Sequence, residues 1–190
     1  MEAMRRNLTR TDWADAALTA LADGGLAAVA VEPIAARLGT TKGSFYWHFA
    51  NRDALIDAAL AHWADQHTEA VIRELEPIAD PQRRLDALLA ATIGRTTANR
   101  AELALLAHAD HPAVAPVLAA VTARRVDFIA AAYRQAGCPE QEARFRAVLG
   151  YTAYIGLLQA QRATAGALLP DADRPGYLSF LHQVLHREQP

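Results

Sequence analysis

The stretch from residue 31 to residue 55 constrains the fold more than any other part of the chain; it reads VEPIAARLGTTKGSFYWHFANRDAL. Apolar residues recur at helical spacing on either side of Gly39, which predicts two short helices joined by a tight turn. Thr41 stands where it can cap the second helix, and Phe45 and Phe49 should face inward because they lie four residues apart. Helices this short are unstable alone, so the stretch needs a further helix beneath it.

Residues 11–22 are expected to supply that helix. Thr11 would cap its start, and the Asp-Gly-Gly sequence at 23–25 would end it. Its apolar face has residues at helical spacing: Trp13, Ala17, Leu18 and Leu21. The three helices would then form a helix-turn-helix unit, whose second helix can lie in the major groove of DNA.

The helix after the turn carries more outward polar and aromatic groups than a self-contained core needs. Lys42 is the only lysine of the chain and could contact guanine or phosphate, whereas Tyr46 and His48 would contact phosphate. Trp47 could belong equally to the core or to the groove, and an ordinary solvated helix face is the alternative for the whole group. The residues expected to contact DNA are Thr40, Thr41, Lys42, Gly43, Ser44, Tyr46, Trp47, His48 and Arg52.

A restrictive set of residues recurs through this stretch: Ile34-Ala35, Leu38-Gly39, Thr41-Lys42-Gly43-Ser44, Tyr46, His48-Phe49 and Leu55. The set resembles the TetR family of bacterial transcriptional regulators, over about the first 60 residues. The resemblance implies an all-α protein with a helix-turn-helix DNA-binding domain over residues 1–55. A larger helical ligand-binding and dimerisation domain would follow over residues 56–190.

One position departs from that family pattern. Similar proteins often place Thr or Ser just before the first of the two short helices, where this chain has Ala30. Loss of a capping hydroxyl costs about 1 kcal/mol of local stability and removes one contact to phosphate. Glu32 would be repelled by phosphate, so this end of the helix should stand off the DNA backbone.

The distribution of charge along the chain indicates that electrostatic attraction to DNA is confined to the N-terminal part. The net charge is −2, but residues 1–52 carry six basic against five acidic side chains. This local excess predicts modest non-specific affinity for double-stranded DNA, with a clear dependence on salt. Arg5 and Arg6 precede the first helix, either as a minor-groove arm or as a disordered segment.

The rest of the chain is predicted to be helical, with segments at 52–75, 81–98, 100–108, 113–136, 139–165 and 174–187. No segment alternates convincingly between polar and apolar residues, so no strands are expected. The segment at 139–165 is apolar all round, which is typical of a helix buried on more than one side. We expect it to pair with 174–187 and with the same helices of a second copy in a homodimer. Two recognition helices spaced roughly 34–36 Å apart would then read an inverted-repeat operator.

The resemblance also implies a small, mostly apolar effector and a repressor that the effector releases from DNA. Binding would shift the long helix that begins at Arg52. Plain core packing is the alternative for each candidate wall residue. The candidates are Trp63, His67, Phe128, Tyr133, Tyr151 and Tyr154, with Arg162 or a histidine as a polar anchor.

Other function classes lack their sequence signals. No glycine-rich phosphate loop, nucleophile elbow or HExxH motif occurs, so no enzyme and no cofactor are expected. The histidine clusters at 108–111 and 182–186 offer too few ligands for a metal. No long apolar run predicts a membrane span, and the single cysteine is consistent with the cytoplasm. A helical interaction module with vestigial DNA binding is the alternative function, favoured by the weak positive charge and by Ala30.

Overall fold

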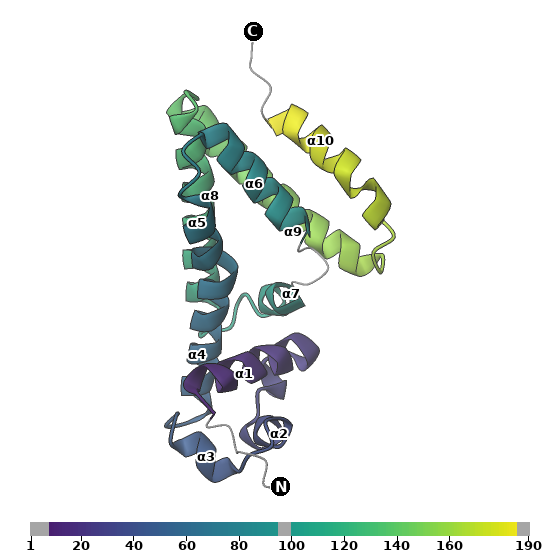
Figure 1. Ribbon diagram of the computed structural model, residues 1–190. Helices are drawn as coiled ribbons and strands as arrows, with labels where there is room; N and C mark the ends of the chain where they lie inside the picture. Colours follow the sequence, from purple (N-terminus) through teal and green to yellow (C-terminus); the bar gives the residue numbers. More distant parts are fainter. Residues whose placement is uncertain (1–7, 95–99, 186–190) are drawn as a thin grey trace, which may run out of the picture. The chain divides into compact units, whose positions relative to one another are not determined.

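The computed structural model describes residues 8–94 and 100–185, and within these ranges every regular element is a helix. The arginines at 5 and 6 and the ends of two expected helices, at 95–98 and 186–187, lie outside the described residues. Figure 1 shows the order of the helices. They are α1 Arg10–Gly24, α2 Val31–Arg37, α3 Lys42–Tyr46, α4 Arg52–Ala64, α5 Ala70–Leu75, α6 Pro81–Gly94, α7 Arg100–Leu106, α8 Ala115–Gln135, α9 Glu140–Ala163 and α10 Arg174–Leu185. No helix among the described residues is long and apolar enough to cross a membrane.

The described residues pack into two compact units. The N-terminal unit contains the chain up to His67 together with Arg100–Ala119, and the C-terminal unit contains the remainder. Each unit is therefore built from two separate segments of the chain, and the segments of the two units alternate along the sequence. The expected functional division after residue 55 stays a prediction, because a packing unit and a functional domain are different properties.

The core of the N-terminal unit is aromatic. Trp13 of α1 and Phe45 of α3 are both fully buried, and their rings meet edge to face with centroids 5.5 Å apart. Leu55 and Leu60 of α4 are equally buried, and α1 packs against both α4 and α7. This core holds the two short helices, which could not be stable by themselves.

The start of α1 differs from the sequence expectation. The cap is Thr9 and not Thr11, because Thr9 and Asp12 form a reciprocal capping box. The Asp12 N–H donates to Thr9 Oγ1 over 3.2 Å, and the Thr9 N–H donates to Asp12 Oδ2 over 2.7 Å. Two backbone donors are satisfied this way, whereas a cap at Thr11 would satisfy one.

The segment predicted as one helix over 52–75 is interrupted by a π-helical turn at Asp65–Glu69. Two neighbouring arginines of α8 contact this turn: Arg125 Nε donates to Thr68 Oγ1 over 2.9 Å, and Arg124 Nε lies 3.1 Å from Glu69 Oε1. These contacts come from residues far away in sequence, which a local pattern does not reveal.

Helix α8 is the centre of the C-terminal unit. It contributes Val126, Phe128 and Tyr133 to three separate buried clusters. Helix α10 lies along α6 (Figure 1), and its last carbonyl, that of Leu185, accepts from Tyr133 Oη and from Arg146 Nη1. These two bonds attach the end of α10 to α8 and α9.

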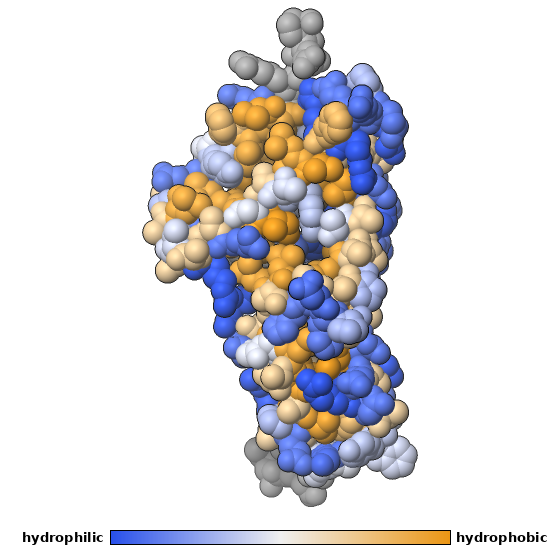
Figure 2. All heavy atoms as spheres, turned by 180° about the vertical axis from the view of Figure 1, so that it is seen from behind, coloured by the Kyte–Doolittle hydropathy of each residue, from blue (hydrophilic) through white to orange (hydrophobic). Residues whose placement is uncertain are grey.

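Large apolar side chains remain exposed on the C-terminal unit. Figure 2 shows apolar residues gathered on its surface, in the upper part of the view. The segment at 139–165, expected to be buried on more than one side, leaves part of its surface uncovered in the single chain. The exposed members on α9 and α10 are Phe145, Val148, Leu149, Phe180 and Val184.

Candidate nucleic-acid interface

The turn between α2 and α3 has the geometry that its sequence predicts. Gly39 has φ +65°, a left-handed conformation that glycine adopts without steric cost. The Thr40 N–H returns to the Ala35 carbonyl over 2.9 Å and closes the end of α2. Thr41 then caps α3 by accepting from the Ser44 N–H. The predicted cap at Thr41 is therefore confirmed.

The inner face of α3 is fixed by Phe45 and its neighbour at Phe49. Both are buried as predicted, and their rings stack with centroids 5.5 Å apart. Arg10 of α1 lies over the Phe49 ring, with its guanidinium carbon 4.5 Å from the ring centroid. Arg10 Nη1 also donates to the His48 carbonyl over 3.1 Å. Sequence reasoning missed this residue, because it acts on a carbonyl 38 positions away.

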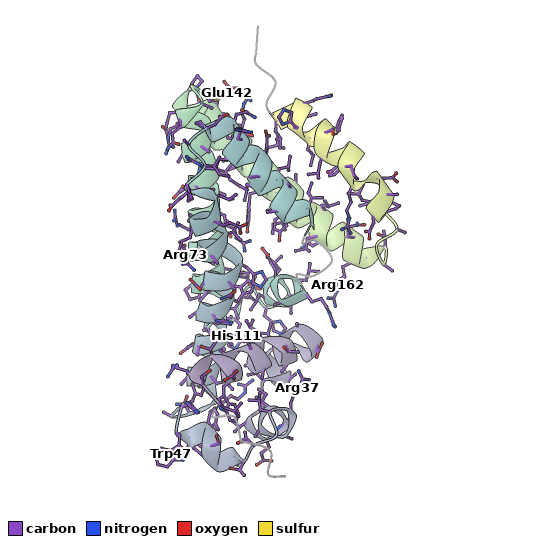
Figure 3. All side chains as sticks on the ribbon, in the orientation of Figure 1. Arg37, Trp47, Arg73, His111, Glu142 and Arg162 are labelled. Carbon is purple, nitrogen blue, oxygen red and sulfur yellow. The ribbon has the colours of Figure 1, made fainter. Side chains whose placement is uncertain are left out.

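The outer face of α3 carries the expected groups. Trp47 is 88% exposed and Tyr46 57% exposed, and Figure 3 shows the Trp47 side chain pointing outward. Trp47 therefore does not belong to the core. Lys42, Gly43 and Thr41 are exposed as well, whereas Thr40, Ser44 and His48 are half-buried.

Lys42 is paired with a carboxylate across the turn. Its Nζ lies 2.9 Å from Oε1 of Glu32, which stands in the first turn of α2. Hydrogen bonding and charge attraction within this pair lower the pKa of the Glu32 carboxyl and raise the pKa of the Lys42 amine. Both groups therefore stay ionised at neutral pH. The sequence contained a signal for this contact, since opposite charges occupy the first turns of the two packed helices.

The start of α2 lacks a side-chain cap, as predicted. Ala30 has extended backbone angles, with φ −119° and ψ 139°, and no side chain accepts from the free N–H groups that follow it. Glu32 is turned toward Lys42 instead of toward this end of the helix.

Arg52, expected to contact phosphate, contacts its own chain. Its Nε donates to the Val29 carbonyl over 2.6 Å, and its Nη2 donates to the Leu26 carbonyl. These bonds tie the first residue of α4 to the 3₁₀ turn at Leu26–Ala28, just before α2. Arg52 thus has a structural role that the sequence did not reveal, and its phosphate contact stays a prediction.

The candidate effector residues are distributed over both units. Trp63 and His67 lie in the N-terminal unit, where Trp63 is fully buried and the two ring centroids are 6.4 Å apart. In the C-terminal unit, Phe128 and Tyr133 belong to different buried clusters. This placement agrees with the alternative interpretation of these two residues, in which they pack in the core and do not line an effector pocket. The remaining candidates are half-buried Tyr151, whose Oη lies 3.0 Å from Thr122 Oγ1, half-buried Tyr154 and exposed Arg162.

No group of three or more metal-binding side chains occurs within residues 8–94 and 100–185. The helix-turn-helix presents hydrogen-bond donors, hydroxyls, exposed aromatic side chains and the Lys42–Glu32 ion pair. Such groups suit contacts to phosphates, sugars and base edges.

Comparisons with known proteins agree with this geometry. The family described as "Bacterial regulatory proteins, tetR family" matches residues 14–59, which include the whole helix-turn-helix. The HTH-type transcriptional regulator BetI of Burkholderia ambifaria is 27% identical over 166 residues, which cover 85% of each chain. The tetracycline repressor protein class A from transposon 1721 of Escherichia coli is 42% identical over 59 residues, which cover 30% of this chain and 27% of the repressor.

A solved structure extends the likeness to the whole fold. The structure of AibR in complex with isovaleryl coenzyme A and operator DNA superposes with a TM-score of 0.66 at 23% identity, covering 91% of this chain and 97% of AibR. The chain therefore has a TetR-like fold, with an N-terminal helix-turn-helix domain followed by a larger helical C-terminal domain. Residues 14–59 therefore form a helix-turn-helix domain of the tetR family of bacterial regulatory proteins, and most of the chain is similar to a known transcriptional regulator.

Proposed function

We propose that the protein is a homodimeric repressor that binds an inverted-repeat operator and leaves it when a small, mostly apolar effector binds. The exposed face of α3 carries the proposal. A five-residue helix with its inner face fully buried leaves Trp47 and Tyr46 in solvent, which is costly unless a partner covers them. Double-stranded DNA is the partner that matches these aromatic groups together with Lys42.

Each residue of the face has a proposed role. Lys42 donates to guanine or to phosphate, and Tyr46 and His48 contact phosphate. Trp47 packs against the sugar-phosphate backbone at the groove edge. The small residues around them let the helix approach the bases; they are Thr40, Thr41, Gly43 and Ser44.

Dimerisation is supported by the uncovered apolar side chains of α9 and α10. Phe145 is 63% exposed, and Phe180 is 58% exposed. A second copy would cover these rings in an isologous interface, in which each residue meets the same surface of its partner. The two-fold axis would then present two α3 helices to successive major grooves, roughly 34–36 Å apart.

The effector is proposed to bind in the C-terminal unit. Tyr151 is the best-placed of the candidates, because it is half-buried and its hydroxyl lies beside that of Thr122. A pair of neighbouring hydroxyls in an otherwise apolar region suits an effector with one polar group. AibR, whose structure contains both isovaleryl coenzyme A and operator DNA, supports ligand control in this fold. The effector must favour the DNA-free state, typically by about 1–3 kcal/mol.

Electrophoretic mobility shift with the DNA that flanks the protein's own coding sequence tests the proposal. Lys42→Ala or Tyr46→Ala should weaken the complex about tenfold or more, with unchanged thermal unfolding. Arg83→Ala is the matched control, because it removes an exposed positive charge from the C-terminal unit. Absence of a complex with the unaltered protein at low salt would favour the interaction module with vestigial DNA binding.

A further inference from the structure

The ion pair between Glu32 and Lys42 lies on the same exposed side of the helix-turn-helix as the proposed DNA contacts. The two side chains are 73% and 53% exposed, and they come from the first turns of α2 and α3. Tyr46, a proposed phosphate contact, is close enough to Lys42 to influence the pKa of its amine. The pair is therefore part of the surface that would meet DNA.

The presence of this ion pair is not explained by a contribution to the stability of the fold. Exposed ion pairs contribute little to the free energy of unfolding, because water and salt screen them. A carboxylate beside a DNA-binding lysine also carries an electrostatic cost, since the phosphates repel it and it occupies the cation that would neutralise them. A role for Glu32 in binding would have to come from a group on DNA that donates a hydrogen bond. In the major groove such donors are the amino groups of cytosine and adenine.

We infer that Glu32 and Lys42 act together as a reading pair for one G·C base pair in each half of the operator: Lys42 donates to O6 and N7 of guanine while Glu32 accepts from N4 of cytosine. This inference rests on the proposed function and adds Glu32 as a specificity-determining residue. Guanine O6 and cytosine N4 adjoin each other at the groove edge, because they are hydrogen-bonded within the base pair. A donor and an acceptor already in contact on the protein match them.

The polarity of the pair distinguishes base pairs. A G·C pair presents two adjacent acceptors followed by a donor, whereas an A·T pair places its amino donor between two acceptors. The Lys42 ammonium can donate to two base atoms at once only where two acceptors are adjacent, as in guanine. The Glu32 carboxylate needs an amino donor beside those acceptors, as cytosine N4 provides. The Glu32 carboxylate is ionised at neutral pH and can only accept, and the Lys42 ammonium can only donate.

Selection of binding sequences from a library of random DNA duplexes tests the inference. The full chain, Glu32→Gln and Asp57→Asn are compared at one salt concentration. Glu32→Gln keeps the shape of the side chain but offers a donor as well as an acceptor. Asp57→Asn removes the same charge from an exposed position on α4 and serves as the control. Thermal unfolding of each variant verifies that it is folded.

The unaltered chain and Asp57→Asn should enrich an inverted repeat with one strongly preferred G·C position in each half. Glu32→Gln should lose about tenfold of the preference at that position and retain the others. An inverted repeat with the same G·C preference for Glu32→Gln overturns the inference while leaving the proposed function standing. Uniformly tighter binding by Glu32→Gln with an unchanged motif also overturns it, because Glu32 would then only repel DNA. Enrichment of no inverted repeat by the unaltered chain refutes the proposed function itself.

Discussion

Gly25 allows a sharp test of how α7 packs within the N-terminal unit. It follows α1 with φ +69° and ψ −167°, a region that side chains other than glycine hardly adopt. A Cβ at this position would stand 2.7 Å from Cε1 of His108, which lies just beyond the end of α7. Carbon atoms in contact need about 3.5 Å, so the imidazole would have to move by about 0.8 Å. Its Nδ1 lies 2.8 Å from the Ala104 carbonyl, and that contact would have to be disturbed.

The cost of Gly25→Ala can be divided into two parts. The backbone conformation contributes about 1–3 kcal/mol, and the steric overlap contributes about 1–3 kcal/mol more. We therefore expect a loss of about 2–6 kcal/mol in the free energy of unfolding, measured by urea denaturation. Gly39→Ala is the matched control: its φ is also left-handed, but no atom lies within 4 Å of the added Cβ. It should cost only about 1–2 kcal/mol.

A double-mutant cycle isolates the steric part. Gly25→Ala in a His108→Ala background keeps the backbone cost but has no imidazole to displace. The coupling energy between the two positions should therefore be about 1–3 kcal/mol. A coupling energy near zero would refute the reasoning, because it would mean that the imidazole does not lie against the Gly25 backbone in solution.

Three further predictions concern other parts of the structure. Arg52→Met should lower the free energy of unfolding by about 2 kcal/mol, because two backbone carbonyls lose their donor; an effect on DNA binding alone would reject the structural role. Phe145→Glu should shift the protein from dimer to monomer in sedimentation at micromolar concentration, whereas a persistent dimer would place the interface elsewhere. Burial raises the pKa of Tyr133 to about 12. Its neutral form therefore stabilises the fold fully below about pH 10, and this contribution is lost as the pH rises toward 12. Tyr133→Phe should show a smaller loss of stability over that range, and identical pH curves would contradict the assignment.

The local features of the helix-turn-helix could be predicted from the sequence because they depend on neighbouring residues. The cap at Thr41 and the left-handed turn at Gly39 are each decided within about four positions, and both occur as predicted. The inward positions of Phe45 and Phe49 follow from helical periodicity in the same way. The all-α class followed from the same periodicity over longer segments.

The features that could not be predicted depend on tertiary contacts. Arg10 and Arg52 each donate to backbone carbonyls more than 20 positions away, and no local pattern marks an arginine for such a role. The π-helical turn is contacted by Arg124 and Arg125, which lie more than 50 positions further along the chain. The capping box at Thr9 could have been found, since Asp12 stands three residues after it.

The solitary lysine has a practical consequence for chemistry. Apart from the α-amino group, this chain offers an acylating reagent one primary amine, and that amine is the exposed Nζ of Lys42. Intact-mass measurement after brief acylation would therefore count at most two acylated amines, Lys42 Nζ and the α-amino group, without digestion of the protein. Enzymatic acetylation, if it acts on a lysine of this protein, has only this side chain to modify, and the modification would neutralise the cation.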